Sequence, residues 1–194
     1  MRVDFESLEL KDCYKIMSRT IIPRPIAWIV TEDEHINIAP FSYFIGLSSN
    51  PPTVIVSVGH KKDGSPKDTL ANIRKTKKCT ICMVDEAHLK QMHYTSKPLE
   101  KERSEAEVFG IETEPLFEGF PPIVKGAPAA FFCTLFQEIE LGGKTIPLIL
   151  KIEKYYVDDA YVKGENFDIQ LDLIARVGAK YAKIGEFIEP PQIP

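Results

Sequence analysis

Two long segments in the last third of the chain alternate between apolar and polar positions. One face of the first would carry Phe131, Cys133, Leu135, Ile139 and Leu141, and one face of the second would carry Ile146, Leu148, Leu150 and Ile152. A period of two residues is typical of β-strands, because alternate side chains point to opposite faces. Gly142 and Gly143 lie between the segments and favour a tight turn. The pattern predicts a β-hairpin.

Four shorter apolar runs also predict strands. They occupy residues 26–31, 36–39, 53–58 and 79–84. Pro23 and Pro25 favour an extended backbone ahead of the first run, and Pro51 and Pro52 interrupt the chain before the third. Residues 32–35 predict a polar hairpin turn between the first two strands.

Helical periodicity is confined to short segments. Residues 8–17 predict an amphipathic helix with Leu10, Tyr14 and Met17 on one side. Residues 86–93 predict a second short helix.

A third helix is expected to begin near Ser65. Ser65 can cap it, Pro66 suits the first helical position, and Asp68 stands at the third. Leu70 and Ile73 supply its apolar face.

Residues 95–122 are polar, punctuated by proline and weakly periodic, which predicts a long excursion with a short helix over 104–109. Such segments often carry binding or interface elements. Strands outnumber helices, and most neighbouring strands are expected to be antiparallel. The fold class is therefore mainly β with α, a small closed β-barrel with peripheral helices, formed by residues 1–194 as one domain.

Composition excludes several classes of protein. Hydrophobic content of 44%, charged content of 27%, a net charge of −4 and a pI of about 5.7 are ordinary for a globular domain and unlike a nucleic-acid binder. The basic run 74–78 fits a solvated helix end. We expect no membrane span, since no run of about 18 apolar residues occurs, and no signal peptide. Four sparse cysteines indicate a cytoplasmic protein.

No side-chain motif in the sequence indicates a metal site or a catalytic nucleophile. Cys79 and Cys82 have the CxxC spacing, but on a strand they point to opposite faces. His88 and His93 are five residues apart, the wrong spacing for one helix face. If the chain is an enzyme, a cofactor is expected to supply the chemistry.

The helix start near Ser65 is a candidate phosphate site. Free N–H groups and the positive end of the helix dipole attract anions, while Lys67 adds charge and Thr69 a hydroxyl donor. Asp68 would repel a phosphate unless its side chain turned back toward the loop. An ordinary capped helix explains the same residues.

The predicted loop 39–49 suits a planar heterocycle. Together with the strand that follows, it offers hydroxyls close to Phe41 and Phe44, namely those of Ser42, Tyr43, Ser48, Ser49 and Ser57. Hydroxyls and backbone amides can contact the edge of a ring that aromatic side chains cover. A hydrogen-bonded turn over a barrel end remains the alternative.

Four runs resemble the flavin reductase-like family, which includes flavoredoxins. They are IPRPIAW at 22–28, NIAPFSYF at 37–44, SSNPP at 48–52 and GSPKDT at 64–69. The runs EAEVFG at 105–110 and ARVGAKY at 175–181 are similar to later motifs of the same family. The resemblance covers nearly the whole chain in the right order.

The resemblance implies an FMN-binding split β-barrel, with non-covalent FMN near the interface of a homodimer. It implies ring and ribityl contacts from loop 39–49, phosphate contacts from 57–59 and 67–69, and two arginines near the site. The implied cofactor-binding residues are Arg24, Ala39, Pro40, Phe41, Ser42, Tyr43, Phe44, Ser48, Ser49, Ser57, Val58, Gly59, Lys67, Asp68, Thr69 and Arg176. Ala179 departs from the family, in which a second glycine is common, and this departure is expected to alter the turn that follows Arg176.

The sequence leaves the activity open between two classes. One is an NAD(P)H-dependent flavin reductase, an enzyme that passes reducing equivalents to FMN. The other is a flavoredoxin-type electron carrier that a redox protein reduces. No nicotinamide fingerprint is visible, although His60 or His93 could approach a nicotinamide. A third possibility is a different substrate, reached through the excursion 95–122.

Overall fold

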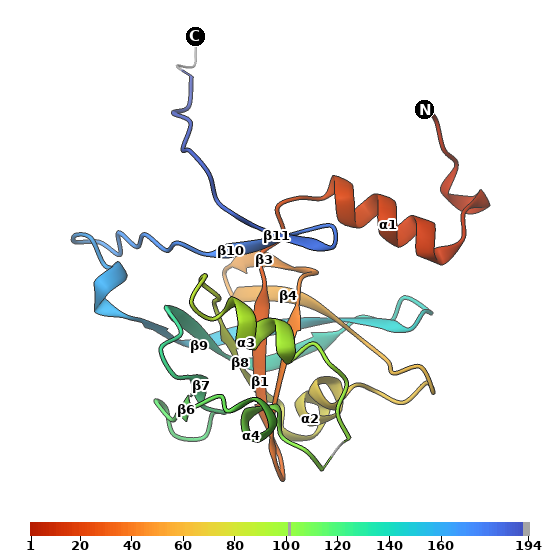
Figure 1. Cartoon of the computed structure of the whole chain (residues 1–194). Coiled ribbons are helices and arrows are strands. Elements are labelled where there is room, and N and C mark those ends of the chain that lie inside the picture. The colour runs from red at the N-terminus through yellow and green to blue at the C-terminus, as the bar shows by residue number, and fades with distance from the viewer. Residues whose placement is uncertain (101, 192–194) are drawn as a thin grey trace.

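The computed structural model describes residues 1–100 and 102–191, and it is dominated by one antiparallel sheet (Figure 1). Seven strands form that sheet in the order β2-β1-β5-β8-β9-β4-β3. Their bounds are β1 Ala27–Glu32, β2 Ile36–Phe41, β3 Phe44–Ser49, β4 Pro52–Gly59, β5 Lys78–Cys82, β8 Ala129–Glu138 and β9 Thr145–Val157. Every neighbouring pair is antiparallel, as expected.

The remaining elements are short. Two small hairpins are formed by β6 Thr113–Glu114 with β7 Ile123–Val124, and by β10 Ile174–Val177 with β11 Lys180–Lys183. The helices are α1 Leu10–Thr20, α2 Asp68–Thr76, α3 Leu89–Tyr94 and α4 Glu105–Phe109, with 3₁₀ turns at Phe5–Ser7 and Asp159–Tyr161.

The barrel is split rather than closed. The edge strands β2 and β3 are not hydrogen-bonded to each other, although only Ser42 and Tyr43 separate them in the chain. The Tyr43 carbonyl accepts a hydrogen bond from the Ser57 N–H at 2.9 Å, which extends the β3–β4 pairing by one residue ahead of β3. The strands therefore form the split β-barrel that the resemblance implies, and no hydrogen-bonded pairing between β2 and β3 closes it as the strand pattern alone suggested.

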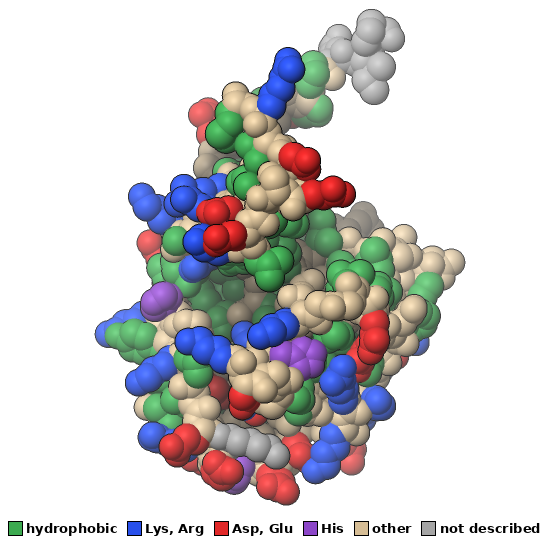
Figure 2. Space-filling model, turned by 90° about the vertical axis from the view of Figure 1, so that its right-hand side faces the viewer, with side chains coloured by type: hydrophobic (Ala, Val, Ile, Leu, Met, Phe, Trp, Pro, Cys, Tyr) green, Lys and Arg blue, Asp and Glu red, His purple; other side chains and the backbone are tan. Residues whose placement is uncertain are grey.

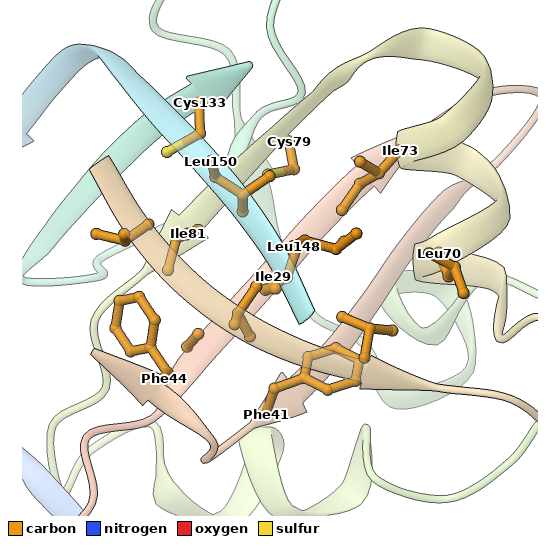
Figure 3. Close-up of a cluster of buried hydrophobic side chains, with 14 of the residues drawn as sticks. Ile29, Phe41, Phe44, Leu70, Ile73, Cys79, Ile81, Cys133, Leu148 and Leu150 are labelled. Atoms are coloured by element: carbon orange, nitrogen blue, oxygen red, sulfur yellow. The ribbon is translucent and has the colours of Figure 1, made fainter. Parts of the chain in front are cut away.

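The core lies on both faces of the sheet. On one face Ile29, Phe41 and Phe44 pack with side chains from α2, β5, β8 and β9 (Figure 3). On the other face Trp28 packs beneath α3 and the excursion, and its indole N–H donates to the Thr95 hydroxyl at 2.9 Å. The prediction that Cys79 and Cys82 point to opposite faces of their strand is confirmed, because Cys79 belongs to the core cluster on one face of the sheet and Cys82 to the cluster on the other face.

Two expected boundaries are wrong. Residues 39–49 are not a loop: β2 continues through Phe41, and Phe44–Ser49 pairs with β4 as an edge strand. The sequence hid this strand because nearly all of its side chains are exposed, so it lacks alternation. Helix α2 begins at Asp68, not near Ser65, and the Ser65 hydroxyl donates instead to Asp63 at 2.7 Å.

The predicted hairpin is confirmed, with a shorter first strand. Strand β8 ends at Glu138, and Leu141 is 69% exposed in the turn rather than on the buried face. The register shifts between Leu135 and Gln137, which breaks the alternation that the sequence suggested. Gly142 takes a positive φ of 75° in the turn.

The excursion is anchored to the β2 edge of the sheet by α4, the short helix predicted at 104–109. The Ser104 hydroxyl donates to the Ile36 carbonyl at 2.6 Å, and the Ile38 N–H donates to the Glu105 carboxylate at 3.0 Å. These bonds occupy backbone groups that an edge strand would otherwise leave unpaired.

The two ends of the described chain contrast with this packed body. Helix α1 is confirmed, with bounds shifted to Leu10–Thr20, but the face formed by Leu10, Tyr14 and Met17 is largely exposed.

The predicted helix at 86–93 starts later, at Leu89. After β11 the chain runs away from the sheet (Figure 1). No helix in the described residues is long and apolar enough to cross a membrane.

Candidate functional site

Two adjoining cavities open beside the β2–β3 corner and share Pro40, Phe41 and Ser96 as lining residues. The larger has a volume of about 640 Å³ and extends along α2 and the segment 95–99. The smaller has a volume of about 210 Å³ and reaches β10 and β11. Together they form one groove, called here the corner groove. On the side facing right in Figure 1, Figure 2 shows a hollow containing hydrophobic side chains, with Lys or Arg side chains along its lower rim.

The larger cavity contains an uncapped helix start. Lys67 occupies the N-cap position of α2, and no side chain in the described part of the chain caps the helix. The first N–H groups of α2 therefore remain available to an anion at the positive end of the helix dipole. The ammonium of Lys67 lies 5.6 Å from the centroid of the Phe41 ring, inside the same cavity.

The charge of Asp68 is compensated within the protein. Its carboxylate pairs with the Lys61 ammonium at 2.8 Å, and both side chains are only partly exposed. The side chain thus turns toward the loop before the helix, as a phosphate site at this position requires. Lys67 and Lys62 add positive charge to the same cavity wall.

A buried network fixes the start of α2 against the sheet. The Asn37 amide donates to both Thr69 Oγ1 at 3.0 Å and Thr31 Oγ1 at 3.2 Å, and the Asn72 amide donates to Thr31 at 3.1 Å. Because Asn37 supplies the proton in its bond to Thr69, the Thr69 hydroxyl keeps its own proton for a further acceptor. Thr69 lines the larger cavity.

The smaller cavity gathers aromatic and titratable side chains from four elements. They are Tyr14 from α1, His93 from α3, Arg176 from β10 and Tyr181 from β11. His93 Nδ1 lies 2.9 Å from the Tyr181 hydroxyl, and the Arg176 guanidinium lies 4.6 Å from the Tyr181 ring centroid. This end offers polar atoms around a space bounded by Phe41 and Tyr14.

Ala179, which stands where the family commonly has a second glycine, does not disturb the hairpin that carries Arg176. Gly178 takes a positive φ of 54°, and Ala179 does not need one. The backbone of Arg176 pairs with that of Arg24 through two hydrogen bonds of 2.8 and 3.0 Å. The hairpin therefore brings Arg176 to the groove.

Arg24 lies behind the groove rather than in it. It is 4% exposed, and its Nη1 donates to the carbonyls of Ser18 and Ile21 at the end of α1. Its Nε and Nη2 have no hydrogen-bond partner in the described residues, and its guanidinium carbon lies 5.5 Å from the Tyr43 ring centroid. Burial raises the pKa of Tyr43, with Tyr14 adding to this effect and Arg24 opposing it. Arg24 thus holds α1 to the corner.

The groove brings together only part of the predicted residue set. Its walls include Ala39, Pro40, Phe41, Ser42, Lys67, Asp68, Thr69 and Arg176. Outside its walls lie Arg24, Tyr43, Phe44, Ser48, Ser49, Ser57, Val58 and Gly59. Phe44 and Val58 are core side chains, and Ser48 and Ser49 lie on the exposed edge strand. Cofactor contacts from this second group remain predictions.

Several groove residues were not predicted as site residues. Lys61 and Lys62 precede the turn before α2, and a lysine pair beside a proposed phosphate site is a usable signal. Tyr14 and Tyr181 come from two distant segments, so no local pattern could group them with His93, which the sequence suggested only as a neighbour of a nicotinamide. No cluster of potential metal ligands occurs in the described residues.

Comparisons with known proteins agree with this architecture. The family model for the flavin reductase like domain matches residues 17–170. An uncharacterized protein of Halalkalibacterium halodurans is 31% identical, over 96% of this chain and 93% of the relative. The uncharacterized protein YwrF of Bacillus subtilis is 30% identical, over 93% of each chain.

Solved structures show the same fold. Nitrilotriacetate monooxygenase component B from Bacillus cereus is 29% identical, with a TM-score of 0.91 and 98% of each chain covered. The flavoredoxin of Desulfovibrio vulgaris (Miyazaki F) is 19% identical, with a TM-score of 0.77 over 98% of this chain and 97% of its own, which supports the fold alone. The chain therefore belongs to the flavin reductase-like family and is a flavin-related redox protein.

Proposed function

We propose that the corner groove binds FMN, with the phosphate at the start of α2 and the ring system toward the smaller cavity. The observation that carries this proposal is the uncapped start of α2, where Lys67 and the Thr69 hydroxyl face the larger cavity. A cavity of about 640 Å³ lies in the range of cofactor sites. Phe41 lines both cavities and so stands between the phosphate end and the ring end.

FMN fits this groove better than an unphosphorylated flavin would. Free helix N–H groups and the Lys67 ammonium are suited to a phosphate group. Lys61 neutralises Asp68, so the carboxylate nearest the helix start does not oppose the anion. In FAD the adenylyl group would extend beyond the phosphate site, next to the same lysines. The titration with FMN, FAD and riboflavin described below distinguishes the two flavins.

We further propose that the protein is a flavin reductase that uses NADH or NADPH, with residues 1–194 acting as one cytoplasmic domain. Bound FMN would supply the chemistry, as the acceptor of two electrons. The residues that line the corner groove would hold the phosphate through Lys67 and Thr69 and present polar atoms at the ring end. Four cysteines without disulfides support a reducing compartment.

A homodimer is part of the proposal. Leu10 on α1 is 89% exposed, and Ile45 and Leu47 on β3 are 63% and 51% exposed. An 11-residue helix with little packing is marginal in water, so the apolar face of α1 needs a partner surface. Tyr14 lies on α1 and lines the smaller cavity, so a second copy covering this helix would adjoin the groove.

The direct test is anaerobic stopped-flow mixing of the FMN-loaded protein with NADH and, separately, with NADPH. Rapid loss of flavin absorbance is expected with at least one of them. If neither reduces the bound FMN while dithionite does, the flavoredoxin-type carrier replaces the reductase, and the donor is a redox protein. Repeating the titration with FMN, FAD and riboflavin tests the choice of flavin, and preferred binding of FAD would contradict the FMN assignment.

A further inference from the structure

His93 stands out within the smaller cavity because of its chemistry. The titratable or charged side chains that line this cavity are Tyr14, His93, Arg176 and Tyr181. An unperturbed tyrosine titrates near pH 10 and arginine stays protonated, whereas an unperturbed imidazole titrates near pH 6.5. Histidine is the residue type that proteins most often use as a general acid or base, so His93 is the candidate proton-exchanging group among the described residues that line this cavity.

Its ring is held in a defined orientation. His93 Nδ1 and the Tyr181 hydroxyl are 2.9 Å apart, and the two rings meet edge to face with centroids 5.8 Å apart. Arg176 packs on the Tyr181 ring and so supports this arrangement from β10. In the tautomer in which His93 Nδ1–H donates to the Tyr181 hydroxyl oxygen, Nε2 holds the lone pair that can take up a proton.

The structure also separates the two histidines that the sequence suggested for a role near the cofactor. His60 lines the larger cavity beside Lys61 and Lys62, and its Nδ1 lies 2.9 Å from the Lys144 carbonyl. His93 lines the smaller cavity, on the far side of the shared residue Phe41. His60 therefore belongs to the phosphate end of the corner groove and His93 to the ring end.

We propose that His93 takes up a proton when the flavin in the corner groove is reduced, and that Tyr181 is its positioning residue. This inference rests on the proposed function. Two electrons entering the ring add negative charge beside the smaller cavity, and a proton moves from water to His93 Nε2 to balance part of it. On reoxidation His93 returns that proton to water. A nicotinamide delivers the two electrons together with one proton, as hydride, whereas a redox protein delivers electrons alone and the ring takes that proton from water; with either donor the additional proton on His93 comes from water.

The test is the pH dependence of the midpoint potential of bound FMN, measured from pH 5 to 9 in wild type and His93→Gln. One additional proton per two electrons steepens the slope by about 30 mV per pH unit. Wild type should show this extra slope within a window near neutral pH, and His93→Gln should lose it. His35→Gln, in the exposed turn between β1 and β2 and outside both cavities, is the matched control and should keep the wild-type curve.

Tyr181→Phe separates positioning from a purely structural contact. It removes the hydroxyl but keeps the ring under Arg176, and it should retain the extra slope with its pH window displaced. Histidine NMR signals of FMN-loaded wild type give a second measurement that does not depend on the variants. One histidine should titrate at higher pH in the reduced protein than in the oxidised protein, and the signal lost in His93→Gln should identify it.

Two results would overturn the inference. The first is a His93→Gln protein that binds FMN and keeps the wild-type potential curve. The second is an unchanged titration of every histidine on reduction. Failure of the proposed function is recognised separately, because wild type would then bind no FMN in the first step of the experiment.

Discussion

Lys67 carries the charge that would distinguish a phosphorylated flavin from its unphosphorylated form. It stands at the N-cap of α2 without a capping side chain, and its ammonium lies over the Phe41 ring. The Asp68 carboxylate beside it is neutralised by Lys61. These contacts make Lys67 the most informative single residue for the ligand.

Replacing Lys67 by alanine should weaken FMN much more than riboflavin. A charge-assisted contact is worth about 1.5–3 kcal/mol, which is about ten- to hundredfold in affinity. Fluorescence titration with both ligands measures the difference, and Lys154→Ala, on an exposed part of β9, is the control. Equal losses for both ligands would mean that Lys67 acts through folding or through the ring.

Thr31 is the buried acceptor that ties α2 to β1. It is fully buried and accepts hydrogen bonds from the amides of Asn37 and Asn72. Thr31→Val should lower the free energy of unfolding by about 1–3 kcal/mol, because the buried Asn72 amide then lacks a partner. Chemical denaturation measures this change. Thr145→Val, at the exposed start of β9, is the control and should leave the free energy of unfolding nearly unchanged. Similar losses of stability in both variants would show that the hydrogen bonds to Thr31 do not account for the effect.

At the scale of elements, the sequence predicted the strands that bury most of their side chains and missed the edge strand that buries almost none. The strands at 26–31, 53–58 and 79–84 were found because buried residues dominate them. Strand β3 was taken for a loop because it is exposed on both faces. Local patterns therefore reveal burial, and edge strands without burial escape them.

Helix boundaries failed for a related reason. The residues near Ser65 have the composition of a capping motif, but Asp63 engages the Ser65 backbone and hydroxyl in a local turn. The helix then starts three residues later, at Asp68. Lys67 and Thr69, at the phosphate end, could be predicted because they lie within one short run of the sequence. His93 and Tyr181, at the ring end, are brought together only by the packing of α3 against β11, which a local pattern does not reveal.

Helix α4 holds the β2 edge through a buried carboxylate whose energy depends on pH. Burial raises the pKa of Glu105, with the hydrogen bond from the Ile38 N–H opposing this shift. A folded-state pKa above the unfolded value means that the native state binds more protons. The contribution of Glu105 to stability is thus fully present below the unfolded pKa of about 4.3 and is lost as pH rises through the folded pKa.

Glu105→Gln should remove that pH dependence. Glutamine keeps an oxygen acceptor for the Ile38 N–H and carries no charge, so the variant should gain stability relative to wild type as pH rises from acidic to neutral. Urea denaturation at several pH values measures the difference. Glu107→Gln, exposed on the same helix, is the control, and a constant difference between Glu105→Gln and wild type would refute the assignment.

At the scale of the whole molecule, the exposed apolar surface supports the proposed homodimer. Leu10, Tyr14 and Met17 form one face of α1, and Ile45 and Leu47 project from the nearby edge strand β3. Beyond β11 the chain also exposes Phe187 and Ile188. A groove bordered by Tyr14 links this surface to the site.

Leu10→Glu and Met17→Glu together should convert the proposed homodimer to a monomer, because the charges would have to be buried in the proposed interface. Light scattering after size-exclusion chromatography measures the mass. Lys15→Glu, an exposed position between them on the same helix, is the control and should remain dimeric. A wild-type protein that is monomeric at micromolar concentration would contradict the dimer itself.

The measurement that tests the account most directly is an equilibrium titration of the purified, flavin-free protein with FMN, followed by flavin absorbance and fluorescence. The corner groove predicts saturable binding of one FMN per chain, tighter than the binding of riboflavin, with the difference reduced in Lys67→Ala. A folded protein that leaves the spectrum of added FMN unchanged would contradict the central claim that this groove is a flavin site.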